Sequence, residues 1–138
     1  MSPAAGDHVV VVEDDPHNAV LFRKLIEKRL QCRVTLTESP DELLALLRAG
    51  DVALVVMDVS LRGSEWDGRP VNGVALCRLL KSDPALAHVP VLLATAHAMR
   101  GDAERLLAES GADSYIAKPV VDHDVFISQA RALMEKAA

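Results

Sequence analysis

The 138-residue chain is poor in the residues on which several classes of protein depend. It has one tryptophan, one tyrosine and two phenylalanines, which are too few and too scattered to form a base-stacking platform for nucleic acid. Its two cysteines, Cys32 and Cys77, do not form a Cys-x-x-Cys pair, so neither a metal knuckle nor a disulfide framework is indicated. We therefore expect a protein of the reducing cytoplasm.

Long hydrophobic runs and an excess of positive charge are also absent. The longest apolar run, residues 52–57, is far shorter than the ~20 residues of a membrane-spanning helix. Lys and Arg number 15 against 20 Asp and Glu, a net charge of −5, which disfavours binding to phosphate backbones. We expect no membrane and no direct nucleic-acid partner. One basic cluster, interrupted by Glu27, has the spacing of a solvated helix face: Arg23, Lys24, Lys28, Arg29 and Arg33.

Apolar strand-like runs alternate with segments of helical periodicity along the whole chain. The run 52–57 is apolar at every position, as in a parallel strand covered on both faces. Ser39, Pro40 and Glu42 are typical of a helix start, and Gly111 is typical of a left-handed helix end. The pattern predicts strands at 8–12, 33–37, 52–57, 89–94 and 114–117, and helices at 16–30, 40–50, 74–80, 102–110 and 122–136.

Strict alternation of strands and helices implies right-handed crossovers and a parallel sheet between two helical layers. We predict an α/β, doubly wound, flavodoxin-like fold with five parallel strands in the order 2-1-3-4-5 and five helices. Residues 1–7 are expected to form a tail and residues 8–136 one domain, with an extended loop at 59–72. In such a fold, ligands bind beyond the carboxyl ends of the strands, at the switch point between the first and third strands.

Carboxylates gather at that switch point. Glu13, Asp14 and Asp15 follow the first strand, and Asp58 ends the third. Like charges this close raise one another's pKa unless a cation joins them, and Mg²⁺ is the hard divalent ion that suits oxygen ligands. Taken alone, the acids directly before Pro16 are better explained as a plain helix start near the positive end of the helix dipole.

Residues at two more strand ends favour a functional site over a plain helix start. Thr95 closes the fourth strand with a hydroxyl, and Lys118 closes the fifth, directly before Pro119. A metal held by acids, a fixed ammonium and a hydroxyl donor are what phosphoryl transfer requires, because its catalysis is mostly positioning and charge neutralisation. Asp58 is the candidate nucleophile, since carboxylates form aspartyl-phosphate intermediates.

These motifs resemble those of the receiver domains of two-component response regulators. The residues that match in order and context are Glu13-Asp14, Asp58, Thr95-Ala96 and Lys118-Pro119. The resemblance covers nearly the whole chain, and within the family the segments around Thr95 and Lys118 look like single-domain regulators of the DivK type.

The resemblance implies a site and its metal. Asp58 would accept a phosphoryl group, and Mg²⁺ would be bound by Asp14 directly, by Asp58, by Glu13 through water and by the backbone carbonyl of Ser60. Asp15 would be a helper or a helix cap. Such a domain catalyses only its own phosphorylation and dephosphorylation, and is not a metabolic enzyme.

The resemblance also implies a switch and its partners. Thr95 would hydrogen-bond a phosphoryl oxygen, Lys118 would pair with the carboxylate or the phosphate, and Tyr115 would swing inward as Thr95 moves. The donor would be a histidine kinase or a histidine phosphotransferase. The output would be a downstream protein that binds the face formed by the fourth helix, fifth strand and fifth helix. His97, two residues after Thr95, could influence the rate of phosphoryl loss.

One segment departs from the family. Fifteen positions separate Asp58 from Gly73, about twice the usual spacing, and Arg62 stands where Pro is common. Trp66 within this loop is either a cover over the local surface or an anchor for a partner, and the sequence does not choose between them.

Three other functions are alternatives to this one. A constitutive interaction module would keep the fold without the chemistry, with the long loop covering Asp58. A Mg²⁺-dependent phosphatase of the haloacid-dehalogenase class would need an acid two residues after the nucleophile, where this chain has Ser60. An FMN-binding flavodoxin is weaker still, because its phosphate loop would here carry three acids.

Overall fold

The computed structural model describes residues 8–61, 65–66, 68–96 and 102–137. Its central feature is a parallel sheet in the order β2-β1-β3-β6-β7, which is the predicted 2-1-3-4-5 order. The fold class is therefore confirmed. The five strands are β1 (His8–Val12), β2 (Arg33–Thr37), β3 (Val52–Asp58), β6 (Val91–Thr95) and β7 (Ser114–Ala117).

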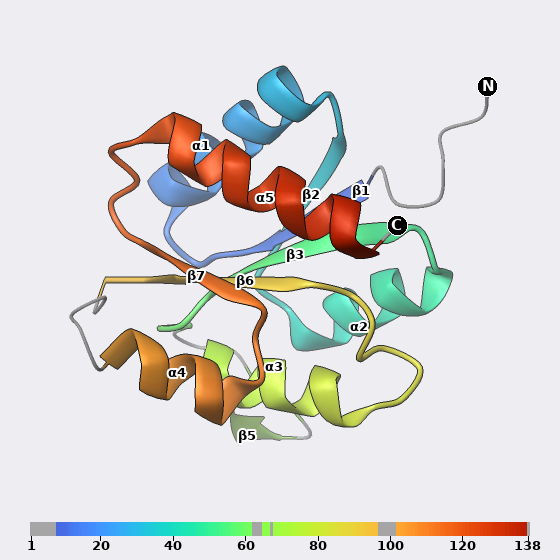
Figure 1. Ribbon diagram of the computed structural model, residues 1–138. Helices are drawn as coiled ribbons and strands as arrows, with labels where there is room; N and C mark the ends of the chain where they lie inside the picture. Colours follow the sequence, from blue (N-terminus) through green and yellow to red (C-terminus); the bar gives the residue numbers. More distant parts are fainter. Residues whose placement is uncertain (1–7, 62–64, 67, 97–101, 138) are drawn as a thin grey trace.

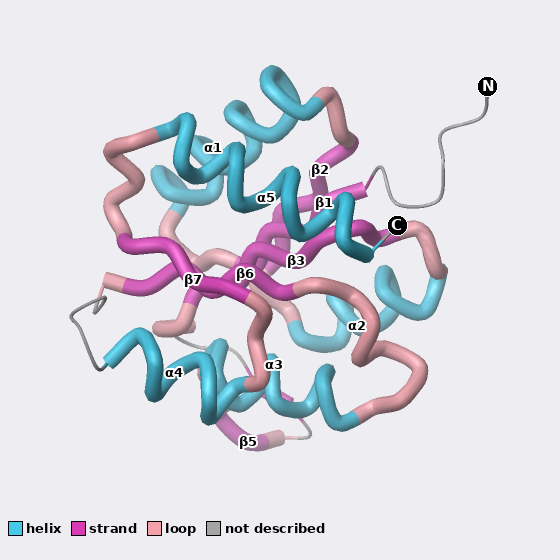
Figure 2. Tube along the Cα trace, viewed as in Figure 1, coloured by secondary structure: helices cyan, strands magenta, loops and turns pink. Residues whose placement is uncertain are grey.

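Helices cover both faces of the sheet (Figure 1), and Figure 2 shows the strands as a layer between them. One face carries α1 and α5, and the other carries α2, α3 and α4. The helical elements are α1 (Pro16–Leu25), a π-helical turn η1 (Ile26–Leu30), α2 (Pro40–Ala49), α3 (Gly73–Ser82), α4 (Asp102–Ser110) and α5 (His123–Ala137).

The alternation of side chains along each strand builds two separate cores. Val9 and Val11 of β1 pack with Phe22 of α1 and Phe126 of α5, whose rings lie 5.1 Å apart. Val10 and Val12 pack on the other face, in the cluster that contains the apolar residues of α2 and α3. Both faces of β1 are thus buried, which explains its uninterrupted valines.

The helix ends that the sequence predicts from particular residues are confirmed. Ser39 Oγ accepts the Glu42 N–H at 3.2 Å, and Pro40 begins α2. Gly50 and Gly111 adopt left-handed backbone angles (φ 91° and 75°) at or after helix ends, where a side chain would be strained.

Several boundaries differ from the prediction by one or two residues, and the first helical segment also ends differently. The fourth strand begins at Val91 instead of Val89, because Pro90 lacks an N–H and contributes only its carbonyl, to Val55 N at 3.0 Å. Helix α3 begins at Gly73, where the Asn72 side chain accepts the Ala75 N–H at 2.8 Å. The predicted single helix 16–30 ends in the π-helical turn η1, which periodicity did not indicate.

The segment 59–72 contains more structure than the predicted loop. Strands β4 (Glu65–Trp66) and β5 (Arg69–Pro70) form a small antiparallel hairpin. Leu61 is buried in the core cluster on the α2–α3 side, and contacts with α2 place β4 on the same side. Arg62 and His97, singled out in the sequence, lie outside the described residues, as does the tail 1–7. No helix in the described ranges is long and apolar enough to cross a membrane.

Candidate functional site

Side chains from three strand ends meet at the carboxyl edge of the sheet. The Lys118 ammonium lies 2.9 Å from Asp58 Oδ1 and 3.1 Å from Glu13 Oε1. These residues are 60 and 105 positions from Lys118 in the chain, so only the topology brings them together. Both carboxylate side chains are almost fully buried, at 1% exposed for Glu13 and 3% for Asp58.

The backbone at the strand ends holds these side chains in place. Each sheet hydrogen-bond ladder extends one residue past its strand: Glu13 N–H donates to Thr37 O at 3.2 Å and Lys118 N–H to Thr95 O at 2.8 Å. Asp58 is the last residue of β3, paired with Ala94 of the neighbouring β6. The ladders of parallel strands therefore align the acids and the lysine at one edge.

Glu13, Asp14 and Asp58 form an acidic cluster that fits a small hard cation. One carboxylate oxygen from each lies within 4.8 Å of the others. Ligands at opposite corners of a Mg²⁺ octahedron are about 4 Å apart, given metal–oxygen distances of about 2.0–2.1 Å. Oxygen donors at this spacing suit Mg²⁺ without large rearrangement. Asp14 is half-buried, between its two buried neighbours and the solvent.

Glu13 carries the largest electrostatic perturbation of the site. Burial, followed by the hydrogen bond and the charge of Asp58, raises the pKa of Glu13 to about 7. The backbone N–H of Asp15, 3.2 Å from Glu13 Oε2, and the Lys118 ammonium counteract this only in part. Without a bound cation, Glu13 is therefore about half protonated at neutral pH.

Asp58 and Lys118 are perturbed in the direction of their charged forms. Burial disfavours the ionised Asp58 carboxyl, but hydrogen bonds from Glu13, Lys118 and the Ser60 N–H outweigh burial and hold its pKa below the usual value. Burial likewise disfavours the Lys118 ammonium, yet Asp58 and Glu13 keep its pKa above the usual value. The site therefore maintains an anionic oxygen next to a fixed cation at neutral pH.

An open cleft of about 740 Å³ leads to these groups. Ser60 lines it, and its backbone N–H donates to Asp58 Oδ1 at 3.1 Å. Thr95 does not line the cleft: its side chain lies beneath the surface, with the residue 1% exposed, while Ala96 forms the wall. Tyr115 is half-buried and lines a different groove. The other lining residues are Glu13, Asp14, Asp15, Pro16, His17, Asn18, Asp58, Lys118 and Pro119.

Asp15 is confirmed as a helix cap. Its Oδ1 accepts the N–H groups of His17 at 2.9 Å and Asn18 at 3.4 Å. His17 and Asn18 are cleft residues that sequence analysis did not assign to the site. Their position at the start of the helix that follows the acids was the available signal.

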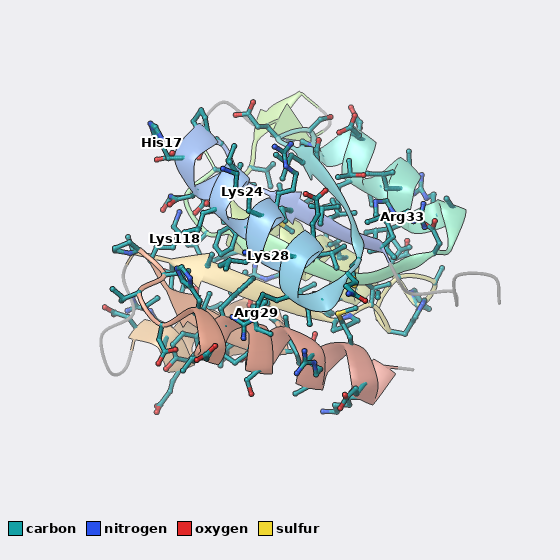
Figure 3. The ribbon with its side chains drawn as sticks, turned by 90° about the horizontal axis from the view of Figure 1, so that it is seen from above. His17, Lys24, Lys28, Arg29, Arg33 and Lys118 are labelled. Atoms are coloured by element: carbon teal, nitrogen blue, oxygen red, sulfur yellow. The ribbon has the colours of Figure 1, made fainter. Side chains whose placement is uncertain are left out.

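The basic cluster is confirmed as surface. Figure 3 shows His17 and Lys118 at one end of the molecule, while Lys24, Lys28 and Arg29 follow α1 and η1 away from that end and Arg33 lies on β2. Arg29 pairs with Asp124 of α5 at 2.8 Å, and Arg33 with Asp51 at 2.7 Å. Lys24 and Lys28 are exposed.

Gly73 is a structural residue of the site that sequence analysis gave no role. A Cβ at this position would lie 1.9 Å from the Asp58 carbonyl oxygen and 3.0 Å from the Val59 Cα. The Gly73 N–H also donates to Val59 O at 2.9 Å, which closes the base of the 59–72 segment. Among the side chains described in that segment, only Ser60 reaches the cleft.

Fold and site together define a doubly wound α/β domain with an acidic, lysine-bearing cleft at its switch point. A family model for the response regulator receiver domain matches residues 9–130. The chain belongs to this family, whose members act in two-component signal transduction.

Individual relatives agree with this assignment. The chain is similar to the polar-differentiation response regulator DivK of Brucella ovis, with 38% identity over 112 residues, covering 81% of this chain and 84% of DivK. A receiver domain of a histidine kinase from Syntrophus aciditrophicus has a TM-score of 0.76 at 27% identity, covering 94% of this chain and 90% of that one. The resemblance to receiver domains predicted from the motifs is thus confirmed.

A further solved structure of the same fold contains a metal ion. The receiver domain of the sensor histidine kinase PA1611 from Pseudomonas aeruginosa PAO1 has a TM-score of 0.76 at 24% identity, covering 95% of this chain and 99% of that one. That protein was solved with a magnesium ion coordinated in its active-site cleft. At this identity the likeness shows a shared fold.

Proposed function

We propose that Asp58 accepts a phosphoryl group from a phosphohistidine of a histidine kinase or histidine phosphotransferase, and that this modification changes the affinity of the domain for a target protein. The observation that carries the proposal is the buried Asp58 carboxylate, hydrogen-bonded to Lys118 at 2.9 Å and opening onto a solvent-accessible cleft. Family membership and the likeness to DivK support it.

In the proposed transfer, an Asp58 oxygen attacks the phosphorus as the phosphorus–nitrogen bond to the donor histidine breaks, and the electron pair of that bond returns to the imidazole. The low pKa of Asp58 keeps the attacking oxygen ionised. Lys118 supplies positive charge beside the oxygens that become more negative, as phosphoryl transfer requires. The chain would catalyse only its own phosphorylation and dephosphorylation, with no turnover of a metabolite.

The proposed cofactor is Mg²⁺. Asp14 and Asp58 would bind it directly, Glu13 through water, and the Ser60 carbonyl would complete the protein ligands. The spacing of the three carboxylates supports this set. When bound, Mg²⁺ neutralises the cluster and orients phosphoryl oxygens. Ionisation of Glu13, whose pKa is about 7, accompanies binding.

The proposed switch couples Thr95 to Tyr115. Thr95 is buried at the end of β6, the strand next to the one that ends at Asp58, and its hydroxyl would hydrogen-bond a phosphoryl oxygen there by drawing the end of β6 toward the site. Tyr115 lies opposite Leu93, two residues before Thr95 on the paired strand. A shift of β6 would therefore be felt at Tyr115, and the face formed by α4, β7 and α5 would change its affinity for the downstream protein.

The alternatives receive less support. The open cleft that leads to Asp58, and the Lys118 ammonium 2.9 Å from its carboxylate, disfavour a module that has lost the chemistry. The phosphatase alternative lacks its acid, since Ser60 occupies that position at the cleft. We also propose that residues 8–136 form the receiver domain with an extended loop at 59–72, and that it works in the cytoplasm, where its two free cysteines suit a reducing medium.

The test is phosphorylation by acetyl phosphate with Mg²⁺, followed by intact-mass spectrometry. The wild-type chain should gain one phosphoryl group, and the Asp58→Asn variant should gain none. Asp15→Asn is the matched control, because asparagine caps a helix as well as aspartate and the change removes one carboxylate from the same cleft. A wild-type chain that is not modified, or an Asp58→Asn variant modified equally, would overturn the proposal.

A further inference from the structure

A second concave surface lies at the edge of the sheet, between β7 and the start of α5. It is a groove of about 340 Å³, and Pro119 lines both this groove and the acidic cleft. Because β7 is the last strand of the sheet, this groove lies beside a strand edge without a strand neighbour (Figure 1). It has a different chemical character from the cleft, since its walls are mainly apolar.

The groove gathers apolar surface that the fold does not bury. In the described part of the chain, three large apolar residues are exposed: Leu79 at 42%, Val121 at 90% and Val125 at 48%. Val121 and Val125 both line the groove, together with Ile116. Leu79 lies on α3, on the other side of the sheet. Two adjacent exposed valines at a groove are more informative than single exposed residues, because a bound side chain can contact both.

The polar side chains Gln129 and Asp122 line the groove, and each carries an oxygen that can accept a hydrogen bond. Gln129 lines it and donates through its amide nitrogen to Tyr115 O at 3.1 Å and to Ser114 Oγ at 3.4 Å. Its amide oxygen is buried without a hydrogen-bond partner, the single such side-chain atom among the described residues. Asp122 is the one charged residue in the described lining, and its carboxylate caps the start of α5 at the Val125 N–H.

These features select the kind of ligand. The Asp122 carboxylate favours a group that donates hydrogen bonds and carries positive charge. It disfavours an acidic segment, which would place like charges together. The exposed valines favour a branched aliphatic side chain next to that basic group.

We propose that this groove binds a short segment of a partner protein in which a branched aliphatic residue is followed by arginine or lysine. The aliphatic side chain packs between Val121 and Val125, and the basic group pairs with Asp122. The inference rests on the proposed role of the α4–β7–α5 face in output, and it specifies the site and the chemistry on the α5 side of that face.

Gln129 also connects the groove to the proposed switch. Its amide nitrogen is hydrogen-bonded to the backbone of Tyr115, so a displacement of Tyr115 moves the floor of the groove. Affinity for the segment is therefore regulated by Asp58 modification, whereas the recognition itself exists in the unmodified protein.

The test uses the unmodified chain, labelled with ¹⁵N, and the capped peptide Gly-Ser-Leu-Arg-Ser-Gly followed by NMR. Saturable shifts should appear at Ile116, Val121, Val125 and the Gln129 side-chain amide, with a dissociation constant near 1 mM, the weak affinity of a short peptide. Peptides with Glu in place of Arg, or Ala in place of Leu, should bind about tenfold more weakly, a loss of about 1.4 kcal/mol.

Paired variants locate the binding. Val121→Ser changes a side chain that is 90% exposed, so the fold is retained, and it should weaken binding about tenfold. Leu79→Ser is the matched control, an exposed apolar residue on α3 outside the groove, and should leave binding unchanged. Absence of saturable shifts, equal binding of the Glu peptide, or equal losses in both variants would overturn the proposal.

The remaining outcomes are also decisive. Shifts at these residues that grow with protein concentration alone, and vanish in Val121→Ser, would show that the groove is a contact between two copies of the chain and would reject the partner segment. The peptide titration contains no phosphodonor and is therefore independent of the acetyl phosphate experiment. Peptide binding can fail although Asp58 is modified in that separate experiment. Failure of Asp58 modification with intact peptide binding would instead reject only the phosphoacceptor function.

Discussion

Mg²⁺ affinity should depend on pH through Glu13. The pKa of this residue is raised to about 7 by burial and by Asp58, so about one tenth of the sites have it ionised at pH 6 and about nine tenths at pH 8. Taking the ionised form as the one that binds, the apparent Mg²⁺ affinity should rise about tenfold over this range. Near pH 7, each ion bound should release about half a proton.

Isothermal titration calorimetry measures both quantities, the second by comparing buffers of different ionisation enthalpy. Glu13→Gln removes the titrating group and keeps the side-chain size, so the pH dependence between 6 and 8 should flatten. Equal affinity at pH 6 and pH 8, or a slope that survives in Glu13→Gln, would refute the assignment of this proton to Glu13.

The same shift predicts the pH dependence of stability without Mg²⁺. A carboxyl group whose pKa is higher in the folded than in the unfolded state favours folding when protonated, so its contribution is present below about pH 4.5 and is lost as the pH rises to about 7. The full shift corresponds to about 3 kcal/mol, and screening in the open cleft reduces this to roughly 1–2 kcal/mol. Urea denaturation at several pH values should show the loss, and saturating Mg²⁺ should reverse it.

Three further predictions follow from particular contacts. Gly73→Ala places a Cβ 1.9 Å from a carbonyl oxygen and should lower the free energy of unfolding in urea by about 2–4 kcal/mol. In Gly68→Ala the new Cβ meets nothing within 4 Å, so only the left-handed backbone is strained and the loss should be about 1 kcal/mol. Equal losses in the two variants would contradict the close approach at Gly73. Lys118→Met should slow phosphorylation by acetyl phosphate about 100-fold, and an unchanged rate would argue against charge neutralisation. Thr95→Ala and Tyr115→Ala should leave the phosphoacceptor reactive but abolish the difference in partner affinity between modified and unmodified protein; either variant that keeps this difference in a binding assay would reject the switch.

Local chemistry made most of the fold predictable. Alternating segments of different period, together with caps such as Ser39 and Gly50, are properties of neighbouring residues and can be read without knowing the fold. The exceptions are local structures decided by packing. The turn η1 and the β4–β5 hairpin carry no strong periodic signal, and Pro90 shifted a boundary through a sheet contact with Val55.

The sequence also predicts which residues form the candidate site, because the residues that follow parallel strands must lie at one edge of the sheet. Glu13, Asp14, Asp58 and Lys118 were anticipated together and do lie together. The effect of these residues on one another's pKa could not be predicted from the sequence. The opposite pKa shifts of Glu13 and Asp58 depend on burial and on which oxygen meets the ammonium, and these depend on distances of a few tenths of an ångström.

The sequence alone determined the order of elements, the parallel sheet and the residue types at its carboxyl edge, because these follow from periodicity and connection rules that act over short distances along the chain. Only the tertiary structure decided that Thr95 is buried beneath the cleft, that Gly73 touches the backbone of Asp58, and that Gln129 leaves an unpaired oxygen beside exposed valines. Those features arise where elements distant in sequence pack together, and close packing gives each such contact a geometry that no single segment encodes.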